Sequence, residues 1–305
     1  GASMFKDMST TPLEEKIEKI LHFETSKGIK KYFKTHFPVR DPQKKTAYVI
    51  GTGPSLKGID MSKLKNEDTI TFNRAYVAFD DWGFHPTYYL SIDSQDLLSI
   101  SEDIVGLMNE GKIKHFFLPH GLIPDGADLD RTTVLKNVPE AWSMMLPFSQ
   151  YTYAEESNLM VTALMANAGY MGMKMLYLMG YQEVVLLGCD ASYRTDEESQ
   201  KSIDWDEDGC FSNEDYDVNH FRHDYFGKGQ RFGRPISDEE TRNIWMTAAF
   251  EIQHVMNDFK VYSCSKGSKI NDIYPYIDFE DFVSGKRPGD TTSQVVAESF
   301  GENKA

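Results

Sequence analysis

From Lys45 onwards, short apolar stretches alternate along the chain with longer amphipathic ones. Six of the short runs have the length and the β-branched or aromatic content of buried strands. They cover residues 46–51, 69–73, 87–92, 114–118, 184–188 and 260–264. Helical spacing indicates helices near residues 55–65, 94–110, 158–180 and 238–258. This alternation predicts an α/β fold of the Rossmann-like type, with a mainly parallel sheet and helices on both faces.

Three segments fall outside the alternation. Residues 1–44 carry an amphipathic pattern over 12–35, which indicates a helical extension outside the sheet. A long polar segment, 190–237, separates the fifth strand from the last helix, and such insertions commonly carry sites or lids. Residues 286–305 have the composition of a flexible tail. We therefore expect a nucleotide-binding catalytic domain over 45–285, with a lid-like insertion at 190–237.

Two apolar patterns predict core helices. The run from Leu159 to Met179 approaches the length of a membrane span, but it contains Asn167 and Lys174, so a buried helix is favoured. The last helix repeats apolar residues at helical spacing, which indicates a core-facing stripe. The stripe consists of Ile244, Ala248, Ile252, Val255 and Phe259.

Charge and cysteine usage narrow the setting. The chain has 305 residues, a net charge of −15 and a pI near 5.0, so nucleic acid is not an expected partner. Cys189, Cys210 and Cys264 form no Cys-x-x-Cys pair, so neither a disulfide framework nor a cysteine zinc site is indicated. We expect a cytoplasmic protein with Cys189 buried and unreactive. The basic residues between Lys27 and Lys45 suggest a solvated face or, alternatively, peripheral contact with the inner membrane face or an anionic acceptor.

The first strand leads into the glycine-rich stretch Gly51-Thr52-Gly53-Pro54-Ser55. Pro54 fits the first turn of a helix, and Gly53 or Ser55 could cap that helix. A helix N-terminus beside a glycine pair offers N–H groups to a phosphate-bearing ligand. Leu56 stands where a dinucleotide-binding motif has its third glycine, so NAD is not expected. A plain strand–turn–helix corner is the alternative.

Polar residues also follow the other strands. The carboxyl ends of parallel strands meet at one edge of a sheet, where ligands bind. Asn73 could pair with a base or ribose, and Asp93 could accept from ribose hydroxyls or bind a metal. A cap or a turn explains each of these residues equally well on its own, and their coincidence is the signal. The residues at the strand ends are Gly51, Thr52, Gly53, Ser55, Asn73, Arg74, Ser91, Asp93, Ser94 and Asp190.

Gly169 lies in a patch of small residues, 166–169, inside the predicted core helix. A glycine there lets the helix approach either a ligand or the sheet closely, and the residue type does not separate these two readings.

The densest group of chemically active residues spans 219–229. It combines His220 and His223 with Tyr225, Arg222 and Lys228, a set suited to acid/base work and to neutralising an anion. A polar loop is the alternative. The remaining histidines lack such neighbours and are expected to be structural or exposed; they are His22, His36, His85, His115, His120 and His254.

An acidic stretch from Asp204 to Asp208, followed by Gly209, resembles the first half of a calcium loop, with Asp215 at the twelfth position. An acidic, solvated loop is favoured over a metal site.

The run from Val49 to Leu56, followed by Phe72-Asn73-Arg74, resembles the bacterial sialyltransferases of the Campylobacter type. It equally resembles the wider DUF115 group, which includes the archaeal 6-hydroxymethylpterin diphosphokinases and the flagellin-modifying motility accessory factors. The helix ending at 178–181, the strand at 183–190 and the histidine stretch extend the resemblance over roughly residues 45–283.

The sialyltransferase resemblance implies roles for individual residues. The glycine turn, with Gly51, Thr52, Gly53 and Ser55, would hold CMP-sialic acid together with Asn73. Ala168 and Gly169 stand at the family's Ser-Gly pair. His220 or His223 would be the general base towards the acceptor hydroxyl, and Tyr193 and Tyr225 would steady the leaving phosphate.

The resemblance thus implies a glycosyltransferase that moves a sugar, for instance a nonulosonate, from a CMP-activated donor to a glycan acceptor without a metal cofactor. Arg222 and Lys228 would offset charge on the leaving phosphate. One alternative is an ATP- and Mg²⁺-dependent pyrophosphokinase, in which Asp93, Asp190 or the acidic stretch holds the metal. Another is a non-catalytic nucleotide-binding module. Assembly into a homo-oligomer is left open.

Overall fold

The structure is a computed structural model that describes residues 38–91, 94–119, 123–135, 167–190, 203–206, 209–212, 231–232, 238–254 and 258–288. The predictions for the helix at 12–35, for the histidine stretch and for almost all of the tail at 286–305 lie outside these residues. The predicted domain boundaries stay predictions.

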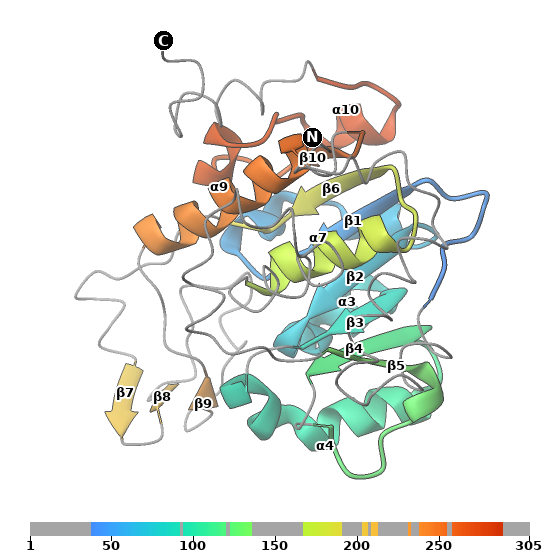
Figure 1. Ribbon diagram of the computed structural model, residues 1–305, viewed down its shortest axis with the longest axis vertical. Helices are drawn as coiled ribbons and strands as arrows, with labels where there is room; N and C mark the ends of the chain where they lie inside the picture. Colours follow the sequence, from blue (N-terminus) through green and yellow to red (C-terminus); the bar gives the residue numbers. More distant parts are fainter. Residues whose placement is uncertain are drawn as a thin grey trace, which may run out of the picture.

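A seven-stranded sheet, parallel throughout, forms the centre of the molecule (Figure 1). Its order is β10-β6-β1-β2-β3-β4-β5. The strands are β1 (Thr46–Ile50), β2 (Asp68–Phe72), β3 (Tyr88–Leu90), β4 (His115–Pro119), β5 (Thr132–Leu135), β6 (Glu183–Leu187) and β10 (Lys260–Ser263). All five residues of β2 are buried, as expected for a strand covered on both faces. The predicted α/β, Rossmann-like fold is confirmed.

One strand was missed. Sequence analysis predicted six strands, and the structure adds β5, which pairs with β4 through the register Phe116↔Thr132. β5 begins with two threonines, so it lacks the apolar run that revealed the other strands.

Three long helices carry most of the packing: α4 (Ser94–Glu110), α7 (Ala168–Leu178) and α9 (Asp238–His254). The prediction for α4 is confirmed at both ends. α7 begins where the Asn167 side chain accepts a 2.8 Å hydrogen bond from the Tyr170 N–H, and the earlier part of the predicted run, 158–166, lies outside the described residues. Among the described helices, none combines the length and apolar character needed to cross a membrane.

The predicted helix near 55–65 was wrong. Two short 3₁₀ helices, η2 (Pro54–Gly58) and η3 (Met61–Leu64), take its place. Gly58 ends the first, and the Asp60 side chain accepts from the Ser62 N–H to start the second. Both residues favour turns and caps over a helix interior. The remaining short helices are η4 (Asn73–Ala78), α3 (Phe79–Trp82), η5 (Leu129–Arg131), η7 (Lys269–Asp272) and α10 (Phe279–Val283).

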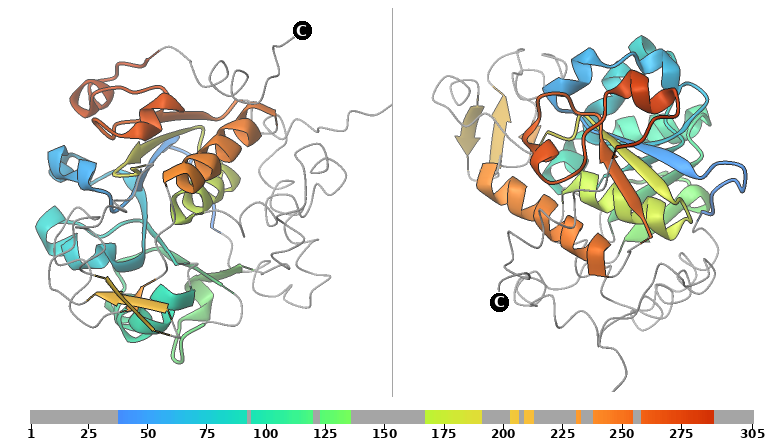
Figure 2. Two further views of the ribbon diagram at one scale, coloured as in Figure 1. Left: turned by 90° about the vertical axis from the view of Figure 1, so that its left-hand side faces the viewer. Right: turned by 90° about the horizontal axis from the view of Figure 1, so that it is seen from above.

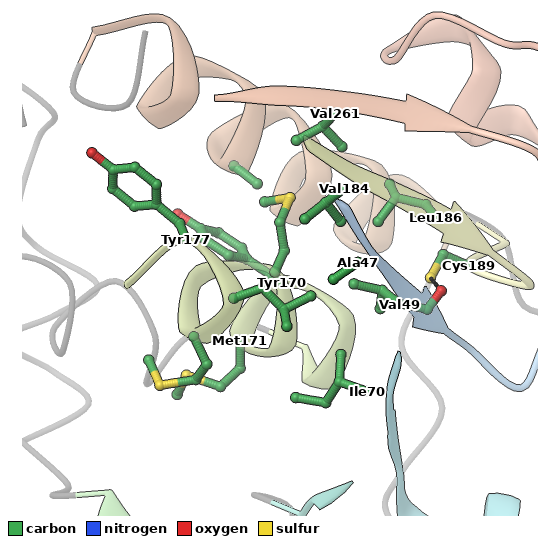
Figure 3. Packing of buried hydrophobic residues seen from close by; sticks show 14 of the residues in the cluster. Ala47, Val49, Ile70, Tyr170, Met171, Tyr177, Val184, Leu186, Cys189 and Val261 are labelled. Atoms are coloured by element: carbon green, nitrogen blue, oxygen red, sulfur yellow. Dashed lines mark hydrogen bonds between the residues drawn. The ribbon is translucent and has the colours of Figure 1, made fainter. Parts of the chain in front are cut away.

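Helices cover both faces of the sheet, as predicted. Figure 2 shows α7 and α9 on one side, with α3, α4 and α10 on the other. β1 supplies both cores, because its side chains alternate between the faces: Ala47 and Val49 pack with α7, whereas Tyr48 and Ile50 join the opposite cluster. Figure 3 shows the first of these cores beneath α7.

The predicted stripe on α9 is confirmed where the structure describes it. Ala248 and Ile252 are buried in the core beside α7, and Ile244 packs against it. Phe259 is buried too, but it lies after the helix; Val255 lies outside the described residues.

A second, antiparallel sheet lies within the insertion. It consists of β7 (Ile203–Asp206), β8 (Gly209–Ser212) and β9 (Arg231–Phe232), in the order β7-β8-β9. Three residues of the acidic stretch, Asp204 to Asp206, therefore lie in a strand instead of the predicted loop, whereas solvation and metal binding of the stretch stay predictions. β9 contacts α4, and Figure 1 places the small sheet beside the amino-terminal end of that helix.

Candidate functional site

The topology marks one place on the carboxyl edge of the large sheet. The chain runs from β1 outwards through β2, β3, β4 and β5, and then returns to lay β6 on the other side of β1. Connections from β1 and β6 therefore leave in opposite directions, and ligands of parallel sheets commonly bind at such a switch point. The glycine turn after β1 and the segment 188–190 after β6 lie at this switch point.

The two turns at the switch point pack backbone against backbone. The Gly51 N–H donates to the Leu187 carbonyl at 2.6 Å, and the Gly53 N–H donates to the Gly188 carbonyl at 2.7 Å. A Cβ on Gly51 would lie 2.5 Å from the Gly188 oxygen. Gly188 also has a φ of 62°, which side chains rarely adopt. These glycines are thus required by the protein's own packing, with or without a ligand.

Asp190 binds the start of η2. Its Oδ2 accepts from the Ser55 N–H at 2.9 Å, and its Oδ1 accepts from the Ser55 hydroxyl at 2.5 Å. Gly53 is the N-cap residue and makes no side-chain cap, so Asp190 supplies the cap from a distant strand. The Ser55 N–H that sequence analysis offered to a phosphate therefore donates to a carboxylate of the chain itself.

Asn73 is held in a strained conformation where β2 ends. Its φ of 55° makes it the single non-glycine residue with positive φ in the described part of the chain. The Tyr89 hydroxyl donates to its backbone carbonyl at 2.8 Å, and the Ser91 hydroxyl donates to its Oδ1 at 3.4 Å. Within the described residues its Nδ2 has no acceptor. Such strain persists where the surroundings fix it, and it is common in binding sites.

Arg74 and Tyr76 connect this end of β2 to α4. The Tyr76 hydroxyl donates to Asp103 Oδ2 at 2.5 Å. Burial, followed by this hydrogen bond, raises the pKa of Tyr76, while the neighbouring Arg74 guanidinium acts in the opposite direction. Tyr76 is therefore a neutral donor at physiological pH, and Arg74 adds a cation next to Asn73.

The small-residue patch at the start of α7 serves helix packing. α7 runs antiparallel to β6, so its N-terminus lies at the carboxyl edge, and Ala168 packs against the core there. A Cβ on Gly169 would lie 2.8 Å from the indole ring of Trp245 on α9. Of the two readings left open, close packing explains Gly169, although its partner is a helix and not the sheet.

The structure thus brings together Gly51, Thr52, Gly53, Pro54, Ser55, Asn73, Arg74 and Asp190 around β1, β2 and β6. Apart from Ala168 and Gly169 on α7, the other predicted site residues lie outside the described part of the chain: Asp93, Tyr193, His220, Arg222, His223, Tyr225 and Lys228. The described residues contain no group of three or more metal-ligating side chains.

Two residues that shape this edge were not singled out. Gly188 and Tyr89 lie within the predicted strands at 184–188 and 87–92, with no further role expected for either. A glycine directly after an apolar parallel strand was the available signal for Gly188, since it lies at the ligand-binding edge. The role of Tyr89 depends on its hydroxyl meeting a neighbouring strand, which the sequence pattern does not show.

The expectations for isolated reactive residues are confirmed where they can be checked. Cys189 is buried, and burial raises the pKa of its thiol well above the usual range, so it is a poor nucleophile. His115 is buried 2.7 Å from the Thr133 hydroxyl, and His85 lies 3.1 Å from Glu110. In the basic stretch, Arg40 donates to the Gly180 carbonyl and Lys44 to that of Asn66, both at 2.8 Å.

Comparison with known proteins gives structural likeness without sequence relatives. No protein-family model matches the sequence. No curated protein matches it either. The alpha-2,3-sialyltransferase from Campylobacter jejuni in apo form aligns over 79% of this chain and 83% of its own, with 16% identity and a TM-score of 0.43.

Two further solved structures align with the chain. The sialyltransferase CST-II in complex with a trisaccharide acceptor and CMP aligns over 85% of this chain and 100% of its own, with 14% identity and a TM-score of 0.43. The MAf glycosyltransferase from Magnetospirillum magneticum AMB-1 aligns over 95% of this chain and 41% of its own, with 13% identity and a TM-score of 0.38. At these values the likeness assigns no reaction to this chain.

Proposed function

We propose that the chain is a sialyltransferase-like glycosyltransferase, which moves a sugar such as a nonulosonate from a CMP-activated donor to a glycan acceptor. The observation that carries the proposal is the polar edge beside the switch point, where Asn73 is held in a left-handed conformation by β3. Residues in this conformation cluster at binding sites, where the surrounding structure holds the side chain in position. The carboxamide of Asn73 can donate and accept, as recognition of a base or ribose requires.

The edge also has the electrostatic character that a nucleotide needs. Arg74 places a cation directly after Asn73, and Tyr76, fixed by Asp103, stays protonated beside it. A monophosphate ester could therefore be neutralised on the β2 side of the edge. The sequence resemblance supports the same class of ligand through the run at 49–56 and the residues at 72–74.

In the proposed reaction the acceptor hydroxyl attacks the anomeric carbon of the donor sugar. His220 or His223 takes the hydroxyl proton, the new carbon–oxygen bond forms, and the bond to the phosphate oxygen breaks with its electron pair leaving on CMP. Arg222, Lys228, Tyr193 and Tyr225 offset the charge that develops on the phosphate. These roles rest on the resemblance. The scheme requires no metal ion.

The test is a thermal-shift panel with CMP, CDP, UDP, GDP and ATP, each with and without Mg²⁺. A ligand present at about a hundredfold its Kd adds roughly 2.7 kcal/mol of stability, which raises Tm by several degrees. We expect CMP to stabilise the protein without Mg²⁺. Stabilisation by ATP alone, and only with Mg²⁺, would overturn the proposal in favour of a pyrophosphokinase.

A measurement of turnover then distinguishes an enzyme from a nucleotide-binding module without catalysis. With a CMP-sugar and a glycan acceptor, His220→Ala or His223→Ala should abolish transfer while CMP affinity is retained. Unchanged turnover in both variants would remove the proposed base, and no turnover in the wild-type protein despite CMP binding would indicate a module without catalysis.

A further inference from the structure

The Asp190 side chain binds the start of the short helix η2, directly after the glycine turn. Its two oxygens accept from the N–H and the hydroxyl of Ser55, at 2.9 Å and 2.5 Å. It also lies against Gly53, where an added Cβ would be 2.4 Å from Oδ2. Phosphate-binding turns offer unpaired N–H groups to the ligand. Here the Asp190 carboxylate accepts from the Ser55 N–H, and the Gly188 carbonyl accepts from the Gly53 N–H.

The charges at this edge are therefore divided between its two sides. β2 and β6 flank β1, so the groups at the ends of β2 and β6 lie on opposite sides of the glycine turn. On the β2 side the Arg74 guanidinium lies near Tyr76, whose hydroxyl binds the Asp103 carboxylate, and on the β6 side the Asp190 carboxylate binds Ser55. A ligand with one phosphate can keep its charge near Arg74 and away from Asp190. A ligand with two phosphates brings more negative charge and more length to the same edge.

We propose that Asp190 is a specificity-determining residue, which lets this site accept a nucleoside monophosphate group and repels nucleoside diphosphates. The inference rests on the proposed function, because that function places the nucleotide at this edge. Repulsion between like charges grows with every charge added and is strong where groups are partly shielded from water. Placing an unmatched charge against the wrong ligand is a general way to obtain specificity.

The variant Asp190→Asn removes the charge and can keep the contacts. The Asn oxygen can accept from the Ser55 N–H, while its NH₂ group donates to the Ser55 hydroxyl oxygen. The matched control is Glu110→Gln, which also removes one carboxylate. Glu110 ends α4, whose direction is opposite to that of β3 and β4, so it lies at the amino edge of the sheet, away from the site.

The experiment is calorimetric titration of the wild-type protein and both variants with CMP, CDP, AMP and ADP, with and without Mg²⁺. We expect the wild-type protein to bind CMP more tightly than CDP. In Asp190→Asn the ratio of the two affinities should fall by about tenfold, as the loss of one nearby charge predicts. Glu110→Gln should leave the ratio unchanged. Circular dichroism checks folding, and Asp190→Ser replaces Asp190→Asn if the latter does not fold.

Each outcome decides between the two proposals. Equal affinity for CMP and CDP in the wild-type protein, or an unchanged ratio in Asp190→Asn, overturns the role of Asp190 and leaves the proposed function standing. Diphosphate binding that needs Mg²⁺ and is lost in Asp190→Asn overturns it as well, because Asp190 would then hold the metal. Binding of AMP without binding of CMP overturns the proposed function, while the AMP/ADP ratio still tests Asp190. Binding of none of the four overturns both.

Discussion

The hydroxyl of Tyr89 donates a 2.8 Å hydrogen bond to the backbone carbonyl of Asn73. Through this bond the third strand of the sheet fixes the one left-handed, non-glycine residue in the described part of the chain. Ser91, two residues further along, holds the side chain of the same asparagine. Different hydrogen bonds thus position the backbone and the carboxamide of Asn73. The effect of the backbone conformation on stability and the effect of the carboxamide on ligand binding can therefore be measured separately.

Replacing Asn73 with glycine or with alanine should separate the effect of the backbone conformation from that of the carboxamide. Asn73→Gly accepts the left-handed conformation at no steric cost, so its free energy of unfolding should stay within about 1 kcal/mol of the wild-type value. Alanine adopts that conformation only at a steric cost, so the free energy of unfolding of Asn73→Ala should fall by about 1–2 kcal/mol. Both variants lack the carboxamide and should bind CMP at least about tenfold more weakly, given the worth of such hydrogen bonds. Urea unfolding and calorimetry measure the two effects. Wild-type CMP affinity in Asn73→Gly would show that the backbone alone matters.

The packing of the two glycine turns predicts a large loss of stability for a single methyl group. Gly188→Ala places a Cβ 2.9 Å from the Gly51 oxygen at a φ of 62°. The clash and the backbone strain together should cost about 2–4 kcal/mol. Gly106→Ala is the control, because nothing lies within 4 Å of its added Cβ in the middle of α4. It should raise stability by about 0.5–1 kcal/mol. A mild effect of Gly188→Ala would show that the turns can separate.

The contact between Gly169 and Trp245 predicts coupling between α7 and α9. Gly169→Ala alone should destabilise the protein by about 1–3 kcal/mol through overpacking. Trp245→Phe removes the part of the ring that the new methyl group would meet at 2.8 Å. The double variant should therefore be more stable than the sum of the two single changes predicts, by about 0.5–3 kcal/mol. Simple additivity in a double-mutant cycle would mean that Gly169 is not a packing residue.

Arg287 binds Glu183, the first residue of β6, at the amino edge of the sheet. Arg287 donates to both oxygens of Glu183, at 2.7 Å and 2.8 Å, and its guanidinium lies 3.8 Å from the Phe282 ring centroid. Arg287→Lys loses the paired geometry and the stacking, so it should cost about 1 kcal/mol. Lys286→Ala next to it breaks only an exposed pair with Asp281 and should cost less than about 0.5 kcal/mol. Equal losses of stability in Arg287→Lys and Lys286→Ala, measured by thermal unfolding, would contradict the special role of Arg287.

Periodicity predicted the elements that are long or fully buried. α4 was placed at both ends because its apolar residues recur over many turns, and β1 and β6 because strands buried on both faces read as apolar runs. At 55–65 the periodicity predicted one helix. Gly58 ends a first 3₁₀ helix there, and Asp60 caps a second one. β5 was missed because its sequence, Thr-Thr-Val-Leu, offers an apolar run of only two residues.

The site was predictable in its location but not in its internal contacts. The rule for parallel sheets placed Ser55, Asn73 and Asp190 at one edge. It could not show that Asp190 already occupies the donors of Ser55, or that Gly51 needs Gly188, because these pairs join segments far apart in the chain. A sequence pattern identifies which residues could bind a ligand; the folded chain decides which of them are already bound to one another.

The order of the strands also has a consequence for synthesis on the ribosome. β1 lies in the interior of the sheet between β2 and β6, yet β6 is made only after five strands of the sheet have emerged. Until Glu183–Leu187 leaves the exit tunnel, one side of β1 is an unpaired apolar edge, a surface prone to pair with other chains. Truncation before β6 should therefore yield aggregates, and a chaperone that shields that edge should matter most during the interval between β5 and β6.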